Sequence, residues 1–141
     1  MEDMSLNNRD FSLAKDIGML LSESRGIDVL VMDMRPLGFW TDYFVIATVT
    51  SSTHLSGLER HIKDFASEND LEILRRSSRP AAGAEQNYGE WCLLDLGNIV
   101  IHLMTANTRS FFELERLWGM APVIYAGDSH SSKSSKSTSS S

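Results

Sequence analysis

A glycine and an asparagine at positions 97 and 98 constrain the fold of this chain more than any other feature. They separate two apolar segments, residues 91–96 and 99–105. A two-residue connection of this kind closes β-hairpins, because glycine adopts positive φ without steric cost and asparagine tolerates it. The connection therefore sets the register of the two strands and predicts Trp91 opposite Met104.

This register gives the two faces of the hairpin different characters. One face is apolar throughout and is expected to be core; it carries Cys92, Leu94, Leu96, Ile99, Ile101 and Leu103. The other face carries the pairs Asp95–Val100, Leu93–His102 and Trp91–Met104. This mixture is not typical of a solvated surface, so we expect either a helix of this chain or a partner molecule to cover it.

A helix is expected after the hairpin, over residues 109–118. A period of 3.6 residues gathers four apolar side chains on one stripe: Phe111, Leu114, Leu117 and Trp118. Phe112 falls roughly 100° or more from the centre of that stripe, on the side of Arg109 and Arg116. An aromatic ring flanked by arginines is typical of a protein interface, and a wide buried face is the alternative interpretation.

Two further helices are predicted earlier in the chain. Apolar residues recur at helical spacing over residues 13–21, with Asp10 or Ser12 as the N-cap and Gly26 as the C-terminal stop. A second amphipathic pattern follows the polar residues 50–53, which serve as an N-terminal cap.

The strand signals lie between and after these helices. Residues 28–34 and 42–49 are continuous apolar runs, which favours strands buried on both faces near the middle of a sheet, joined through residues 36–38. A short strand is expected over residues 71–76. Residues 77–89 are rich in turn formers and predict a loop.

Together these elements predict the order α-β-β-α-β-β-β-α. The strand, helix and strand in the middle suggest a parallel crossover, so the fold class is α/β with a mixed sheet of about five strands and helices on its faces. One domain is expected over residues 1–127, because a chain of 141 residues that is 42% hydrophobic buries a single sizeable core. Serine makes up nine of the fourteen residues 128–141, which are expected to form a disordered tail.

Charge narrows the class of partner. Residues 1–127 carry 11 Lys and Arg against 18 Asp and Glu, a formal net charge of −7. A phosphate backbone repels such a body, so direct DNA binding is not expected and a basic protein partner fits better.

No segment approaches the ~20 apolar residues that cross a membrane, and the acidic start is unlike a targeting peptide, so we expect a cytoplasmic protein. The lone cysteine, Cys92, is expected to be buried and inert.

Three segments in this order resemble one known family. They are TDYFVIATVTSSTH at residues 41–54, WCLLDLGNIVIHLM at residues 91–104, and R-x-x-F-E-L-E-R-L-W at residues 109–118. They closely resemble the ribosomal silencing factor family, also called Iojap-like or DUF143. The similarity spans roughly residues 9 to 124, nearly all of the expected domain.

The resemblance implies a binding protein with no cofactor and no catalysis. Members of this family dock on the large ribosomal subunit through the ribosomal protein uL-fourteen and sterically block joining of the small subunit, which represses translation during starvation. The resemblance also implies an architecture related to the nucleotidyltransferase fold and a homodimer when the protein is free. The absence of an Arg-rich, acid-poor leader indicates a bacterial cytosolic member.

Carried over residue by residue, the resemblance also implies a binding site. The partner-binding residues are Trp91, Asp95, Leu96, Arg109 and Phe112, and the supporting residues are Leu93, His102, Met104 and Arg116. Relatives more often carry tyrosine at position 112, so a hydrogen bond from that hydroxyl is lost here. His102 is placed to reach Asp95 diagonally across the hairpin, which would rigidify the binding face.

The relation to nucleotidyltransferases raises a nucleotide-binding enzyme as one alternative, and a purely structural homodimeric scaffold is another. Nucleotidyl transfer requires clustered carboxylates that hold Mg²⁺, usually beside a Gly-Ser turn. Asp28 and Asp33 flank a strand at an odd spacing that puts them on opposite faces, and no Gly-Ser pair precedes them. His54 and His61 have no third ligand placed by the sequence. We therefore expect no catalytic residues and no metal site.

Overall fold

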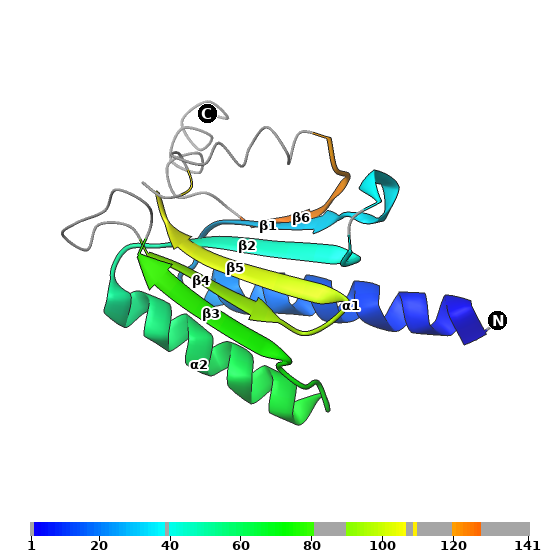
Figure 1. The fold of residues 1–141 in the computed structure, drawn as a ribbon, viewed down its shortest axis with the longest axis horizontal. Helices are drawn as coiled ribbons and strands as arrows, with labels where there is room; N and C mark the ends of the chain where they lie inside the picture. Colours follow the sequence, from blue (N-terminus) through cyan, green and yellow to red (C-terminus); the bar gives the residue numbers. More distant parts are fainter. Residues whose placement is uncertain (1, 39, 81–89, 107–108, 110–119, 128–141) are drawn as a thin grey trace, which may run out of the picture.

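The computed structural model describes residues 2–38, 40–80, 90–106, 109 and 120–127. These residues form a mixed six-stranded sheet with two helices, α1 (Glu2–Glu23) and α2 (Ser52–Glu68), which pack side by side on one face (Figure 1). The predicted α/β class is confirmed, with six strands where about five were expected. Of the helix expected over residues 109–118, only Arg109 is among the described residues, and the serine-rich tail lies outside them.

The sheet mixes parallel and antiparallel pairs. Its spatial order is β3 (Arg75–Pro80), β4 (Glu90–Asp95), β5 (Ile99–Thr105), β2 (Tyr43–Val49), β1 (Ile27–Asp33) and β6 (Val123–Ala126). The strands β2 and β5 are parallel, and all other neighbours are antiparallel. β3 therefore runs parallel to β2, and the connection between them through α2 is the predicted parallel crossover, with β4 and β5 lying between the two strands.

The hairpin of β4 and β5 has the predicted register. Trp91 lies opposite Met104, and Asp95 lies opposite Val100 at the turn end. The N–H of Leu96 donates to the carbonyl of Ile99 at 2.9 Å. Gly97 has a φ of 99°, in the region that glycine adopts without steric cost. The two-residue connection thus sets the register as its sequence predicted.

The core lies in two clusters, one on each face of the sheet. The larger cluster joins the sheet to both helices and includes Ile17, Leu21, Val45, Ile62, Cys92 and Ile101. The smaller cluster lies on the opposite face and includes Met32, Met34, Phe44, Ile46, Val100 and Met104. Cys92 is fully buried, as its place on the apolar face of the hairpin predicted.

The start of α1 differs from the prediction. The helix begins at Glu2 and continues through Asp10 and Ser12, which were expected to cap it. The carboxylate of Asp10 accepts a hydrogen bond from Asn98 Nδ2 at 2.8 Å and so joins the helix to the hairpin turn. The residues before Asp10 include good helix formers, so the helix extends beyond its apolar stripe.

The other helix ends follow the expected rules more closely. α1 ends as Arg25 adopts a left-handed φ of 78°, and Gly26 donates to the carbonyl of Leu21 at 2.7 Å. A Cβ on Gly26 would lie 2.8 Å from that same oxygen, so the close approach requires glycine. At the start of α2, the hydroxyl of Ser51 accepts the N–H of His54 at 3.0 Å.

Two strand assignments need correction. β3 begins at Arg75 rather than Leu71 and runs to Pro80, into the segment expected to be a loop. The reason is its partner: β4 ends at Asp95, opposite Arg75, so the ladder stops there, with one further bond from the Leu74 N–H to the Asp95 carbonyl at 2.7 Å. The sixth strand, β6, was not predicted, because its four residues are too few to give a clear pattern.

Candidate functional site

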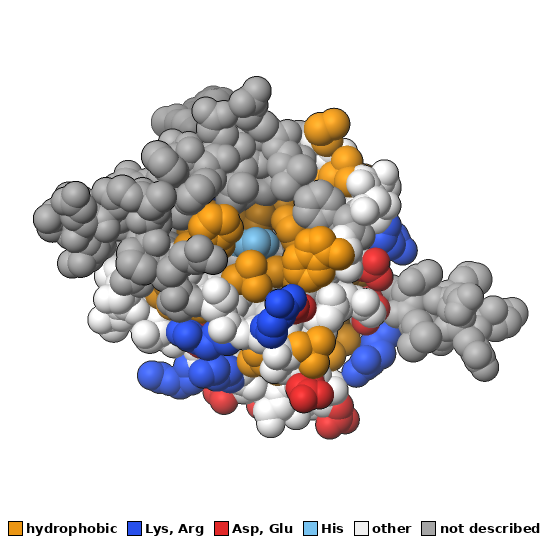
Figure 2. All heavy atoms as spheres, in the orientation of Figure 1, with side chains coloured by type: hydrophobic (Ala, Val, Ile, Leu, Met, Phe, Trp, Pro, Cys, Tyr) orange, Lys and Arg blue, Asp and Glu red, His pale blue; other side chains and the backbone are white. Residues whose placement is uncertain are grey.

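The face of the sheet opposite the helices brings together one residue predicted to bind a partner and three predicted to support it. They are Trp91, Leu93, His102 and Met104, and Phe44 of β2 joins them; we call these five residues the second face. Figure 2 shows hydrophobic side chains gathered around a histidine over the strands. Met104 is fully buried, whereas Trp91 and Leu93 are half-buried.

Two aromatic contacts order the second face. The indole Nε1 of Trp91 donates a hydrogen bond to His102 Nδ1 at 3.2 Å. The ring of Phe44 meets the imidazole edge-on, with 4.6 Å between centroids and an interplanar angle of 65°. Trp91 is thereby held against β5 by both packing and a directed bond.

His102 is neutral in this environment. Burial lowers the pKa of His102 to about 4, from an ordinary value near 6.5. Because Nδ1 accepts the indole N–H, the neutral ring carries its proton on Nε2. This Nε2 is buried and has no hydrogen-bond partner among the described residues. The expected contact with Asp95 is not formed, because that carboxylate is bound at the turn.

The lowered pKa of His102 predicts a loss of stability in mild acid. The unfolded chain binds a proton at this residue below about pH 6.5, and the folded chain only below about pH 4. His102 therefore costs no stability above about pH 6.5, and it lowers the free energy of unfolding progressively as the pH falls from 6.5 towards 4. At pH 5, this effect of His102 lowers the free energy of unfolding by about 2 kcal/mol. Urea unfolding of the wild type and His102→Gln at pH 7 and pH 5 measures this change.

The wild type is expected to lose about 2 kcal/mol more than His102→Gln between these two pH values. His61→Gln removes an exposed histidine of α2 and serves as the matched control. The free energy of unfolding of His61→Gln should change with pH as that of the wild type does. Equal pH dependence in the wild type and His102→Gln would show that His102 does not titrate differently in the folded chain.

The other predicted residues lie elsewhere. Asp95 is buried, and its carboxylate accepts the N–H of Gly97 at 2.8 Å and Nη2 of Arg75 at 3.2 Å. These contacts give Asp95 a structural part in the turn. Leu96 is half-buried and packs against the helix-side cluster, at the opposite end of β4 from Trp91.

Arg109 is buried and donates from Nη1 to the hydroxyl of Thr48. Thr48 lies opposite Met104 in the parallel pair of β2 and β5, so the structure brings Arg109 to the border of the second face. Phe112 and Arg116 lie outside the described residues.

A second apolar surface surrounds the hairpin turn, and the sequence reasoning missed most of it. Trp40 is 63% exposed and Leu74 is 55% exposed. The next residue, Thr41, donates from Oγ1 to the carbonyl of Gly97 at 3.1 Å, and Leu74 Cδ1 would lie 3.6 Å from a Cβ on Gly97. We call Trp40, Leu74 and Leu96 the turn patch. The tryptophan in the connection between β1 and β2 is the feature of the sequence that could have drawn attention to it.

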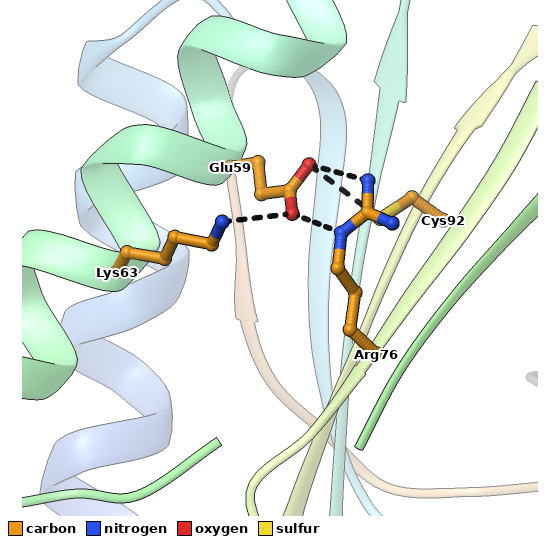
Figure 3. A network of polar contacts seen from close by, with 4 residues as sticks. All are labelled: Glu59, Lys63, Arg76 and Cys92. Carbon is orange, nitrogen blue, oxygen red and sulfur yellow. Dashed lines mark hydrogen bonds and ion pairs between the residues drawn. The ribbon is translucent and has the colours of Figure 1, made fainter. Parts of the chain in front are cut away.

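A buried carboxylate ties α2 to the edge of the sheet (Figure 3). Glu59 accepts two hydrogen bonds from Arg76 of β3, through Nε and, at 3.0 Å, through Nη2. Lys63 lies 3.5 Å from the same carboxylate, and the Cys92 thiol lies 4.0 Å from it. The bond from Arg76 holds the pKa of Glu59 below its usual value. This network positions β3 beside the hairpin and was not predicted.

Of the two carboxylates weighed for nucleotidyl transfer, Asp28 is exposed and Asp33 is engaged in a structural contact. Asp33 accepts Nε and Nη2 of Arg35, both at 2.8 Å, and this ion pair lowers the pKa of Asp33. The Arg35 guanidinium lies 5.4 Å from the centre of the Tyr43 ring. In the described part of the chain, no three His, Cys, Asp or Glu side chains are grouped to hold a metal ion.

No described helix has the length and apolar character that crossing a membrane requires.

Comparison with known proteins decides the family. The model of the family described as "Ribosomal silencing factor during starvation" matches residues 7–141. The chain belongs to the ribosomal silencing factor family. The resemblance carried by the three sequence segments is confirmed.

Relatives in this family come from bacteria and from organelles. The chain is 32% identical over 112 residues to the ribosomal silencing factor RsfS of Bacillus subtilis, covering 79% of this chain and 89% of the relative. It is 35% identical over 107 residues to the mouse protein named mitochondrial assembly of ribosomal large subunit protein 1, covering 73% of this chain and 45% of that protein. A crystal structure from Bacillus halodurans aligns with a TM-score of 0.59 at 25% identity, covering 84% of this chain and 98% of that one.

Proposed function

We propose that this ribosomal silencing factor binds the large ribosomal subunit through the protein uL-fourteen and sterically blocks joining of the small subunit. It would repress translation under nutrient limitation in the bacterial cytoplasm, without catalysis. The observation that carries this proposal is the family match over residues 7–141. The names of the relatives add support, since one is a ribosomal silencing factor and another assembles a ribosomal large subunit.

The geometry is suited to such a contact. Trp91 and Leu96 lie at opposite ends of β4, roughly 17 Å apart at about 3.3 Å per residue. A standard interface of about 800 Å² per partner is roughly 30 Å across, so one partner is large enough to span the distance between Trp91 and the hairpin turn. Half-buried and exposed tryptophans are typical anchors of interfaces. Steric blocking then needs only a tight patch and no active site.

Co-sedimentation tests the proposal. The purified protein is centrifuged through a sucrose cushion with large subunits, with small subunits, or alone, at near-physiological salt. We expect pelleting with large subunits only. Adding the protein before the two subunits are mixed should reduce the yield of joined ribosomes. If the protein stays in the supernatant with every particle, the proposed function is wrong.

We expect Trp91→Ala and Phe112→Ala each to weaken binding to the large subunit by about 2 kcal/mol, roughly 30-fold, as loss of an aromatic anchor does. Binding isotherms by co-sedimentation measure the effect. Met19→Ala removes a partly exposed side chain from α1, on the other face of the sheet, and should bind like the wild type. Because Trp91 also packs against the core, unfolding curves must first show that its variant is folded. Wild-type affinity in both folded variants would exclude this surface.

We also propose that the free protein forms a homodimer through the same surface, because an exposed apolar patch favours self-association. Sedimentation velocity with and without large subunits tests this. If the second copy and the large subunit compete for this surface, adding large subunits should dissociate the dimer. A dimer that persists on the ribosome would favour the scaffold alternative.

A further inference from the structure

The edge of the sheet carries cations that the proposed protein contact does not use. They lie on α2 and β3 and comprise Arg60, Lys63, Arg75 and Arg76, which we call the basic edge. Arg79 follows in the same strand, opposite Trp91 in the register. Figure 2 shows Lys and Arg side chains gathered over this part of the molecule, beside the hydrophobic side chains of the sheet. β3 is the terminal strand, so no described strand pairs with its outer edge.

Buried carboxylates hold these cations so that they face outward. The side chains of Asp95 and Glu59 are only 7% and 9% exposed, whereas those of Arg75 and Lys63 are 75% and 55% exposed. One carboxylate, Glu59, serves both Arg76 and Lys63, so this group retains a net positive charge. The surface that a ligand meets is therefore cationic, although each pair contains an acidic residue.

One acidic residue of α2 lies away from this surface, and another borders it. On a helix with 100° per residue, Lys63 and Arg60 lie about 40° and 100° from Glu59. Glu68 lies about 180° from Glu59, on the opposite side of the helix, whereas Asp64 lies about 140° from Glu59, one turn after Arg60 and about 40° from it. Because exposed charges more than about 8–10 Å apart are largely screened at physiological salt, the net charge of −6 does not cancel the local positive charge. The basic edge thus differs from the rest of this acidic protein.

We propose that the basic edge binds the phosphodiester backbone of structured RNA, as a second contact on the large subunit beside the protein contact. The inference rests on the proposed function, because the large subunit is where this surface would meet RNA. Arginine forks and lysine ammonium groups on a rigid strand and helix suit phosphate oxygens. The contact orients the protein without reading sequence, since phosphate contacts position a protein and base contacts specify it.

The experiment compares two variants that change the net charge equally. Arg60→Gln/Lys63→Gln removes two exposed cations of the basic edge, and Arg76 still pairs with Glu59. Lys15→Gln/Arg25→Gln removes two exposed cations from α1 and the turn after it. Binding to large subunits is measured by co-sedimentation at 50, 100 and 200 mM KCl. Binding to a fluorescent 16-base-pair RNA duplex is measured by anisotropy at the same salt concentrations.

We expect the basic-edge variant to bind both large subunits and the RNA duplex at least about fivefold more weakly than the wild type at 100 mM KCl. Its plot of log affinity against log salt should be shallower by about 2, because each of the two cations removed neutralises one phosphate in the wild type. The affinity and the salt dependence of Lys15→Gln/Arg25→Gln should equal those of the wild type. An unchanged slope and affinity in the basic-edge variant would overturn the proposal.

The two arms separate this inference from the proposed function. If the wild type does not bind large subunits, the proposed function is wrong, and the RNA duplex still tests the basic edge. If the wild type binds large subunits and all variants bind equally, only the basic edge is excluded. If the basic-edge variant loses subunit affinity but no form of the protein binds the duplex, the ligand is an acidic protein segment, which overturns the RNA assignment.

Discussion

Replacing Arg76 with methionine is expected to lower the free energy of unfolding by about 3 kcal/mol. Among the described residues, the change leaves the Glu59 carboxylate, which is 9% exposed, with Lys63 at 3.5 Å and the Cys92 thiol at 4.0 Å. An uncompensated buried charge is strongly destabilising, whereas the methionine retains the apolar part of the arginine side chain. Urea unfolding at pH 7 measures the loss.

Two further variants show whether the stability is lost with the ion pair or with the packing of the arginine side chain. Glu59→Leu in the Arg76→Met background removes the stranded charge and should restore most of the lost stability. Lys63→Met removes the more exposed cation and should cost less than about 1 kcal/mol. Arg76 holds the pKa of Glu59 below 4.5, so the ion pair is fully stabilising above pH 4.5 and its contribution is lost as the pH falls further. The difference in the free energy of unfolding between the wild type and Arg76→Met should therefore become smaller in acid. A difference that stays constant with pH would contradict an electrostatic origin.

The same glycine-to-alanine change is expected to have opposite effects in the two helices. In α2, a Cβ on Gly57 meets no atom within 4 Å, so Gly57→Ala should raise the free energy of unfolding by about 1 kcal/mol through helix propensity alone. In α1, a Cβ on Gly18 would lie 2.4 Å from Val31 Cγ2 and 3.1 Å from Tyr125 Cδ2. Gly18 is the point at which α1 approaches β1 and β6.

Overpacking at this point is expected to outweigh the gain in propensity. Val31 is fully buried and β-branched, so its methyl group has no alternative rotamer to adopt. An overpacking cost of about 3 kcal/mol against a gain of about 1 kcal/mol leaves Gly18→Ala about 2 kcal/mol less stable than the wild type. Thermal and urea unfolding of both variants provide the test. If both alanines stabilise the protein, α1 does not pack as closely against the sheet as the structure indicates.

Much of the fold was predictable because its signals are local. The register of β4 and β5 follows from a two-residue turn, and the buried position of Cys92 follows from that register. The strands β1 and β2 were recognised from their continuous apolar runs. β2 is buried throughout in the middle of the sheet, as predicted, whereas β1 lies next to the edge strand β6 and is only partly buried. The short strand β6 and the early start of α1 were missed, because four residues show no clear period and polar residues extend a helix without an apolar stripe.

The candidate site was predicted less completely than the fold. Trp91, Leu93, His102 and Met104 do lie together, because they share one face of a hairpin whose register was known. The exposure of Trp40 depends on the loop that joins β1 to β2, and its place beside the turn depends on the bond from Thr41 to Gly97. A tryptophan in this loop marks the position, but its exposure and its place beside the turn are not encoded in the neighbouring sequence.

The sequence by itself determined the family, the α/β class, the hairpin register and the face of the hairpin that carries the predicted site. Only the tertiary structure decided which polar groups meet. Glu59 and Arg76 are 17 residues apart, and Thr48 and Arg109 are 61 residues apart. Such partners are chosen by how helices and strands pack, and packing depends on contacts between distant segments that the local periods of 2 and 3.6 residues do not encode.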